Sequence, residues 1–325
     1  MRRARRNFLR LTVGAAALPL ASRIAAAQAY PSRPVRVLVG FAPGGATDTT
    51  ARLIGAWLSE RLGQQFIVEN RPGAGTNIAT QELVRSAPDG HTLLMVTASN
   101  AINATLYSNM NFNFLRDTVP VGCIIRYPNV VEVNNDLPVK TIPEFIAHLK
   151  ANPGKLSMGS GGIGSSQHLA GELFKMMTGT DLTHVPYRGG APALVDLIGG
   201  RIQVRFGVLP ESMASIREGK IRALAVTTTT RNEFLTDVPT VHEFVPGYDA
   251  ASVQGVAAPR GTPPEIIERL NQEINAGLAQ ARIKERFAAL GATVWPGTAA
   301  EFGKFMADET EKWGKVVKFA GAKAE

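Results

Sequence analysis

The sequence predicts an α/β protein built from two similar units. Short β-branched runs alternate with segments of helical periodicity from residue 35 onward, a pattern typical of parallel sheets with helical crossovers. The order of strand, glycine-rich loop and helix start occurs twice, at residues 35–62 and 156–176. The 325 residues are enough for two domains with cores of their own.

The first glycine-rich loop follows the strand at 35–39. Pro43 excludes helix before the turn, whereas Gly44 and Gly45 permit positive φ angles and leave backbone N–H groups uncovered. Thr47 or Asp48 is expected to cap the helix that follows, which runs to residue 62. Free amides at a helix start favour an anion beyond the carboxyl end of the strand. The alternative is a tight strand–helix turn that binds no ligand.

The rest of the first unit continues the alternation of strand and helix. We predict strands at 66–69 and 92–96 and a helix at 77–85. In parallel sheets of this kind, ligands bind at the carboxyl ends of the strands. Thr97 and Ser99, which follow the third strand, are therefore expected at the same edge as Gly44 and Gly45.

The second unit contains the second glycine-rich loop, at 159–168. A strand at 130–133, a helix at 143–150 and a short strand at 156–158 precede it, and Thr141 is expected to cap the helix. Ser165 or Ser166 is expected to cap the helix that follows the loop. Two helix starts that favour anions, one in each half of the chain, suggest a ligand held between two domains.

The remaining segments complete the second unit and end in helices. Predicted strands lie at 182–185, 202–206, 223–227 and 249–258, and predicted helices at 193–198, 264–279, 282–290 and 300–319. Thr262 is expected to cap the helix at 264–279, because two prolines stand at its start. The sequence has no long linker, which fits two domains that the chain crosses more than once.

The N-terminus has the pattern of an export signal. Arg5 and Arg6 form a twin-arginine pair, an apolar run follows at 11–20, and small residues at 25–27 provide a cleavage site, with residue 29 as a second choice. We predict a Tat signal peptide at 1–27 and a periplasmic protein, since the apolar run is too short to span a bilayer. The single Cys123 excludes an intramolecular disulfide.

Removal of this signal changes the charge balance. Residues 1–27 hold six arginines and no acid, so their loss lowers the formal charge from +8 to +2. No basic stripe with aromatic residues remains, and we expect no nucleic acid partner. The first loop also lacks the spacing of the dinucleotide and P-loop motifs, so we predict no cofactor.

The serines and histidine of the second loop allow a hydrolase as an alternative. Ser160 or Ser165 would act with His168, although the sequence has no G-x-S-x-G elbow at this loop, and helix caps and polar lining explain the hydroxyls better. His168 and Glu172 share a helix face and offer half of a metal site. The other histidines show no ligand spacing, so we expect neither a metal ion nor catalytic residues.

Seven segments in sequence order resemble the Bug family, the substrate-binding proteins of tripartite tricarboxylate transporters. They are FAPGGATD at 41–48, VENRPGAG at 68–75, APDG at 87–90, HLAGELF at 168–174, VPYRG at 185–189, APAL at 191–194 and ALAV at 223–226. The resemblance runs from about residue 30 to the C-terminus and so covers nearly the whole mature chain.

The resemblance implies a two-domain periplasmic binding protein, type II-like, in which each domain is a mixed, mainly parallel sheet flanked by helices and a small carboxylate binds in the cleft between them. We place domain 1 at 28–128 plus 250–325 and domain 2 at 129–249. Partners would be a small organic acid and the permease subunits, with the protein itself a monomer. The expected ligand residues of domain 1 are Phe41, Pro43, Gly44, Gly45, Thr47, Asp48, Thr97 and Ser99, and those of domain 2 are Ser160, Gly164, Ser165, Ser166 and His168. A ligand-sensing partner of a membrane receptor is the alternative to transport.

Three positions depart from the family pattern. Many members have aspartate where this chain has Gly207, methionine where it has Arg205, and Trp-Phe at 253–254. The loss of an acid and the gain of an arginine would favour a more anionic ligand. Arg205 lies between Val204 and Phe206 in a predicted strand, so it either reaches a ligand carboxylate or has an acidic partner in the protein.

Overall fold

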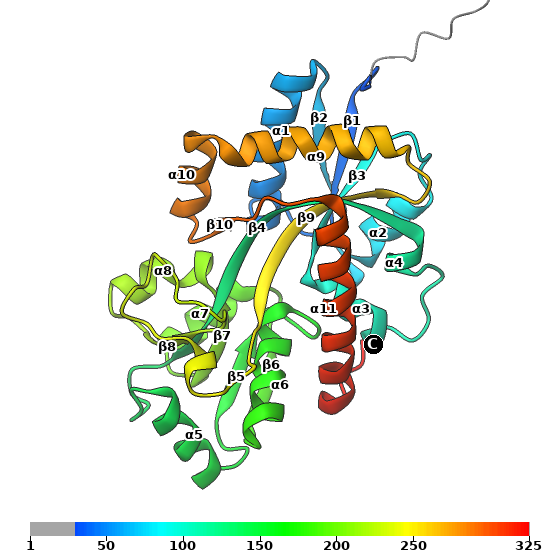
Figure 1. Ribbon diagram of the computed structural model, residues 1–325. Coiled ribbons are helices and arrows are strands. Elements are labelled where there is room, and N and C mark those ends of the chain that lie inside the picture. Colours follow the sequence, from blue (N-terminus) through cyan, green and yellow to red (C-terminus); the bar gives the residue numbers. More distant parts are fainter. Residues whose placement is uncertain (1–29, 325) are drawn as a thin grey trace, which may run out of the picture.

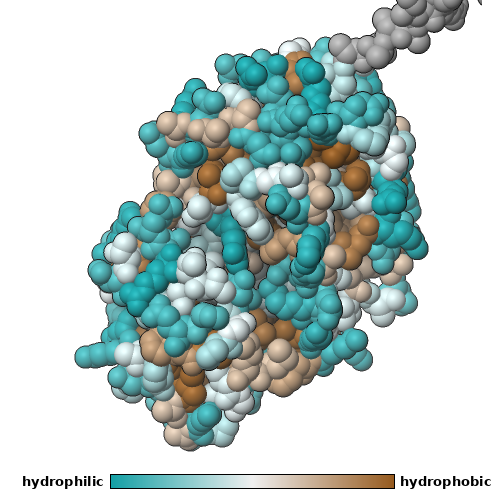
Figure 2. Space-filling view, viewed as in Figure 1, coloured by the Kyte–Doolittle hydropathy of each residue, from teal (hydrophilic) through white to brown (hydrophobic). Residues whose placement is uncertain are grey.

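Two lobes joined by long strands make up the computed structural model, which describes residues 30–324 (Figure 1). The predicted Tat signal at 1–27 and the first two residues of the predicted domain 1 lie outside this range. Hydrophilic side chains cover much of the face in Figure 2, with hydrophobic patches between them.

The first lobe is built on three parallel strands in the order β2-β1-β3. They are β1 (Val35–Val39), β2 (Phe66–Asn70) and β3 (Thr92–Thr97), and their buried apolar side chains explain the strand pattern of the sequence. The helices of this lobe are α1 (Ala46–Leu62), α2 (Asn77–Val84), α3 (Ala98–Leu106), α4 (Phe114–Asp117), α9 (Pro264–Ala279) and α10 (Ala281–Ala289), with a 3₁₀ turn, η1 (Ala74–Thr76), before α2.

The second lobe has the same plan. Three parallel strands lie in the order β7-β5-β6, namely β5 (Ser157–Ser160), β6 (Thr183–Pro186) and β7 (Val204–Val208). Around them lie α5 (Ile142–Ala151), α6 (Ser166–Thr178), α7 (Gly190–Ile198), α8 (Leu209–Arg217), the strand β8 (Arg222–Val226) and the 3₁₀ turn η2 (Val241–Glu243).

Two long strands connect the lobes. β4 (Thr118–Val133) pairs with β9 (Ala251–Pro259) as far as Pro128, and with β7 and β8 from Asn129 onward. The short β10 (Thr293–Val294) adds to β4, and every pairing of β4 and β9 is antiparallel. The two parallel sheets are therefore one continuous mixed sheet, in the order β2-β1-β3-β9-β4-β7-β5-β6. The predicted α/β class is confirmed, and the predicted strand at 249–258 corresponds to β9. The predicted strand at 130–133 is only the end of β4, and the antiparallel pairing of β4 with β9 was not predicted.

Helix α11 (Ala299–Ala320) also joins the lobes. It packs against α3 of the first lobe and α6 of the second, as Figure 1 shows beside β9. Trp313 on this helix is fully buried, and its indole N–H donates to Glu309 Oε2 over 2.6 Å. One apolar core runs through both lobes, because Leu94 of β3, Phe206 of β7 and Val317 of α11 belong to the same cluster.

Two helix starts differ from the sequence prediction. Helix α1 begins at Ala46 with Gly45 as its N-cap, so Thr47 and Asp48 lie inside the first turn and cap nothing. Helix α9 begins at Pro264, and the Thr262 hydroxyl donates to the Pro259 carbonyl instead of capping the helix. At α9 the fixed φ of the two prolines sets the boundary, whereas at α1 the extended backbone of Gly45 places it ahead of Thr47.

Three helices were missed, one of them the four-residue α4. Helix α3 follows β3 directly and α8 follows β7 directly, with Thr97 and Val208 as their N-caps. No turn residue separates strand from helix at either point, so the sequence offered no boundary signal of the usual kind.

Candidate ligand-binding site

The first glycine loop leaves the start of α1 open. Residues 41–45 are exposed, and within the described chain no side chain caps the helix at Gly45. Gly44 has a φ of 84°, as expected, but Gly45 has φ −77° and ψ 172°, so the prediction of positive φ is wrong for Gly45. The first-turn amides of α1 therefore have no side-chain cap among the described residues, and binding of an anion there stays a prediction.

The Asp48 side chain holds the first glycine loop in place through hydrogen bonds. Its buried carboxylate accepts hydrogen bonds from the Gly44 N–H at 2.9 Å, from Arg52 Nε at 2.9 Å and from Asn70 Nδ2 at 3.0 Å. Burial opposes ionisation, but these hydrogen bonds outweigh it, and the pKa of Asp48 is lowered from its usual value. Asn70 also donates to the Phe41 carbonyl over 2.9 Å, so the loop is held at both ends.

The second glycine loop is capped by a side chain. Ser165 Oγ accepts the N–H of His168 over 3.2 Å, which confirms the predicted cap at Ser165. Gly164 has a φ of 76°, and its N–H donates to His168 Nδ1 over 3.2 Å. A side chain at residue 164 would overlap Leu106 of α3, so this loop of the second lobe rests against the first lobe.

The hydroxyl of Ser160 pairs with a histidine that the sequence analysis did not single out. Ser160 Oγ lies 2.6 Å from His184 Nε2, and the His184 ring stacks on the His168 ring with centroids 3.8 Å apart. Burial lowers the pKa of His168 to about 3 and that of His184 to about 4. Within residues 30–324, the His168 ring makes no hydrogen bond to a serine hydroxyl, which the hydrolase alternative required, and Ser160 itself is fully buried.

His168 and Glu172, the predicted half of a metal site, are separated by a long contact. His168 Nε2 lies 3.8 Å from Glu172 Oε1, whereas Lys175 Nζ is closer to that oxygen, at 3.1 Å. Between residues 30 and 324, no group of three or more His, Cys, Asp or Glu side chains is arranged to hold a metal ion.

Polar side chains of the hinge strands contact the starts of both α1 and α6. Gln254 Nε2 of β9 donates to Thr47 Oγ1 of α1 over 3.3 Å and to the Tyr127 hydroxyl of β4 over 3.0 Å. Two residues away on each strand, Ser252 Oγ donates to Asn129 Oδ1 over 3.0 Å. Asn129 Nδ2 in turn donates to the carbonyl of Ser166 over 3.1 Å.

The sequence analysis missed these four hinge residues, although a signal was present. Tyr127 and Asn129 stand two apart on one strand, and Ser252 and Gln254 stand two apart on the other, so each pair shares a sheet face. Thr97 pairs directly with Gln254 in the register of β3 and β9, which places this predicted residue next to the hinge residues. Thr97 is the N-cap of α3, and Ser99 lies in the first turn of that helix.

Arg205 lies in a buried ionic cluster. Its Nη1 atom is 3.3 Å from Glu132 Oε2 and 3.2 Å from Ser212 Oγ, and its Nη2 atom donates to Glu211 Oε2. The arginine is 0% exposed. Of the two interpretations left open by the sequence, the acidic partner describes the structure, and a direct ligand contact of Arg205 stays a prediction.

Glu132 fills the space above Gly207, because any side chain at residue 207 would overlap the Glu132 carboxylate. Burial raises the pKa of Glu132 to about 7, against the opposing effect of Arg205. The argument for a more anionic ligand assumed an unpaired arginine, and that premise is wrong. The charge of Arg205 is balanced by carboxylates of the protein itself.

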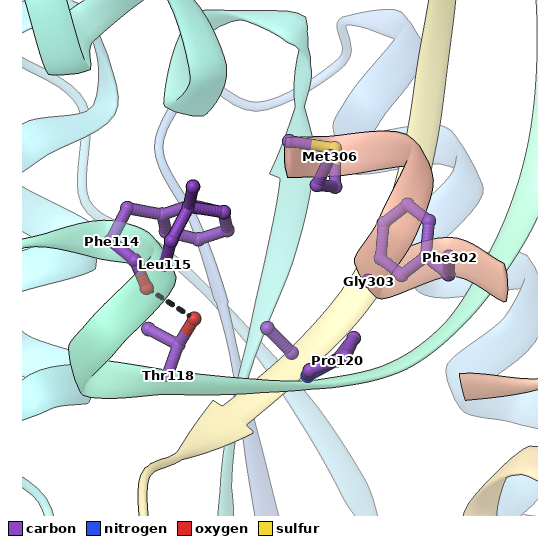
Figure 3. A pocket seen from close by; sticks show the side chains of 8 residues that line it. Phe114, Leu115, Thr118, Pro120, Phe302, Gly303 and Met306 are labelled. Carbon is purple, nitrogen blue, oxygen red and sulfur yellow. Dashed lines mark hydrogen bonds between the residues drawn. The ribbon is translucent and has the colours of Figure 1, made fainter. Parts of the chain in front are cut away.

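Two cavities lie away from the glycine loops. Figure 3 shows one of about 70 Å³, with Phe114 and Leu115 on one side and Phe302 and Met306 on the other. This is far below the roughly 300–1,000 Å³ of typical ligand pockets. A second, of about 270 Å³, is lined by Cys123 and residues 295–298, 301 and 302. Neither is lined by a predicted ligand residue.

Comparisons of sequence agree with the motifs. The family model described as "Tripartite tricarboxylate transporter family receptor" matches residues 50–322. Protein BugT of Bordetella pertussis is 39% identical over 300 residues, which are 91% of this chain and 92% of BugT. A UPF0065 protein of Agrobacterium vitis is 36% identical over 320 residues, 97% of this chain and 92% of that protein.

Solved structures give the same result. Rpa4515 of R. palustris, solved with adipate, is 40% identical with a TM-score of 0.82, covering 90% of this chain and 99% of that chain. MatC (Rpa3494) of Rhodopseudomonas palustris, with bound malate, is 31% identical with a TM-score of 0.79, covering 89% and 100%. Within residues 30–324 no helix has both the length and the apolar character needed to cross a membrane. The chain belongs to the TctC, or Bug, family of periplasmic solute-binding proteins.

Proposed function

We propose that this protein captures a small dicarboxylate or tricarboxylate between the loops at 41–48 and 160–168 and delivers it to a tripartite tricarboxylate transporter. The observation that carries the proposal is the hydrogen-bonded path from Thr47 through Gln254 and Tyr127, beside the link from Asn129 to Ser166. It ties the start of α1 in one lobe and the start of α6 in the other to the same hinge strands. Two helix N-termini near one hinge suit a ligand with a carboxylate at each end.

The relatives support the substrate class. One structural neighbour was solved with adipate and another with malate, both of which are dicarboxylates. The ligand residues in the two loops would contribute mostly backbone amides, because Gly44, Gly45 and Gly164 present no side chains.

The change of partner along β4 supports the two-domain assignment. We place the boundary between Pro128 and Asn129, with 28–128 plus 250–325 as domain 1 and 129–249 as domain 2. Antiparallel hinge strands without an intervening loop allow a small rotation of one lobe against the other.

Mass spectrometry of small molecules released from the purified protein tests the proposal, together with thermal shifts for mono-, di- and tricarboxylates. A ligand at a hundred times its Kd stabilises the folded state by about 2.7 kcal/mol, a readily measured shift. The proposal requires stoichiometric binding with the acid recovered unchanged. Turnover of the acid would favour the hydrolase alternative, and no binding of any carboxylate would overturn the proposal.

Export and delivery have separate tests. Replacement of Arg5 and Arg6 by lysine should retain the precursor in the cytoplasm if the Tat assignment is right. In vivo crosslinking of the liganded protein should recover the permease subunits, and recovery of a membrane receptor in their place would favour the sensing alternative.

A further inference from the structure

Three strand ends meet in the second lobe. β6, β5 and β7 are parallel neighbours, so the residues that follow them lie at one edge of the sheet. Gly161 follows β5, Gly190 follows β6, and Glu211 follows β7. A Cβ atom on Gly161 would lie 3.3 Å from the Gly190 nitrogen, and one on Gly190 would overlap the Glu211 carboxylate. The Glu211 carboxylate therefore lies against Gly190, which in turn lies next to Gly161 of the second glycine loop.

Only one carboxylate oxygen of Glu211 accepts hydrogen bonds from the described part of the chain. Oε2 accepts from Gln167 Nε2 over 3.2 Å and from Arg205 Nη2, whereas Oε1 accepts from no group within residues 30–324. The side chain is 33% exposed, although Arg205 behind it is fully buried.

Gln167 adds a second unused acceptor. Because a carboxylate only accepts hydrogen bonds, the contact with Glu211 fixes which end of the Gln167 amide is nitrogen. Its Oε1 atom therefore points the other way, toward Gly161, where a Cβ would lie 3.5 Å from it. Gln167 is only 5% exposed, and Oε1 has no donor in the described part of the chain. Buried acceptors without donors are rare in folded proteins.

Resting on the proposed function, we propose that Glu211 and Gln167 form an acceptor subsite that selects a carboxylate carrying a hydroxyl or ammonium group. The negative charge of Glu211 repels a ligand carboxylate, which belongs at the amides of the two glycine loops. A hydroxyl or ammonium group beside that carboxylate supplies the donor that both oxygens lack. Arg205, held between Glu132 and Glu211, positions the Glu211 carboxylate toward the ligand.

Isothermal titration calorimetry with matched acids tests this subsite. The probes are succinate, malate and aspartate, with glutarate, 2-hydroxyglutarate and glutamate as the series one carbon longer. The wild type should bind the substituted acids at least about tenfold more tightly than the unsubstituted acid of the same length. Glu211→Gln should reduce this preference to less than about threefold, and more so for the amino acid than for the hydroxy acid, because the charge is lost.

The control is Glu218→Gln, at the other end of α8, which should keep the wild-type preference. If Glu211→Gln does not fold because Arg205 loses a partner, the triple variant Glu132→Leu, Arg205→Met and Glu211→Gln removes every charge of the cluster and should show the same loss of preference. Equal affinity of wild type for substituted and unsubstituted acids would overturn the subsite and leave the proposed function intact. The same holds if the preference survives in both variants. No affinity for any of the six acids would overturn the subsite, and the wider screen of mono-, di- and tricarboxylates then decides the proposed function.

Discussion

Arg205 and Glu132 stand directly opposite each other on antiparallel strands, both 0% exposed, with Nη1 and Oε2 3.3 Å apart. Glu211 adds a second carboxylate to the same guanidinium. Arg205, which departs from the family pattern, is thus paired with Glu132 of β4 and Glu211 of α8. Its role in the fold can be tested separately from ligand binding.

Replacement of Arg205 by methionine should destabilise the protein. The change leaves the buried Glu132 without its cation, and removal of one partner from a buried pair costs about 3–5 kcal/mol. Urea unfolding followed by circular dichroism measures this loss. The double variant Arg205→Met with Glu132→Leu should recover part of it, since the buried carboxylate is gone. A melting temperature near that of the wild type for the single variant would contradict a structural role.

Glu132 should make the protein less stable as the pH rises. Its pKa in the folded state, about 7, lies above the unfolded value of about 4.5, so the folded state binds more protons in that range. Its contribution to stability is fully present below pH 4.5 and is lost as the pH rises through 7. The difference in unfolding free energy between wild type and Glu132→Gln should change between pH 4.5 and 8 by on the order of 1–3 kcal/mol. A constant difference would mean that Glu132 is ionised throughout.

The stacked histidines His168 and His184 should make the protein less stable as the pH falls. The pKa values of His168 and His184 are lowered to about 3 and about 4, from about 6.5 in the unfolded chain. Their contribution is fully present above pH 6.5 and is lost as the pH falls toward 4. His184→Gln should reduce the loss of stability between pH 7 and 4.5, whereas His148→Gln on α5 serves as the control. Parallel pH profiles for all three proteins would refute the effect.

The two glycines of the first loop should respond differently to valine. Gly45 has an extended backbone, and a Cβ atom there would make an ordinary 3.7 Å contact with the Ala42 carbonyl oxygen, so Gly45→Val should fold normally and weaken ligand binding by covering the start of α1. Gly44→Val should in addition lose roughly 1–3 kcal/mol of stability, because valine is strained at a φ of 84°. Calorimetry and thermal unfolding of both variants separate the effects, and unchanged affinity in Gly45→Val would move the site elsewhere.

Ligand binding should close the two lobes. If each lobe supplies half of the site, binding shifts the population from open to closed, and the radius of gyration in small-angle scattering should fall with saturating ligand. Identical curves from apo protein and from protein of proven occupancy would favour a preformed pocket within one lobe.

The sequence by itself determined the local elements. The strand, glycine loop and helix of both units follow from β-branched runs, helical periodicity and turn residues. Ser165 caps α6 as predicted, because a serine stands directly before the helical run. These signals depend on residues within a few positions of each other, so they can be read without knowledge of distant contacts. The family motifs added the mixed α/β binding-protein fold, which the structural neighbours confirm.

Only the tertiary structure decided how distant segments meet. The register of β4 with β7 set Glu132 against Arg205, and the packing of α8 brought Glu211 to the same guanidinium. The contact of Gln254 with Thr47 joins residues 207 positions apart. Such contacts arise from strand register and the packing of whole elements, which no local pattern encodes.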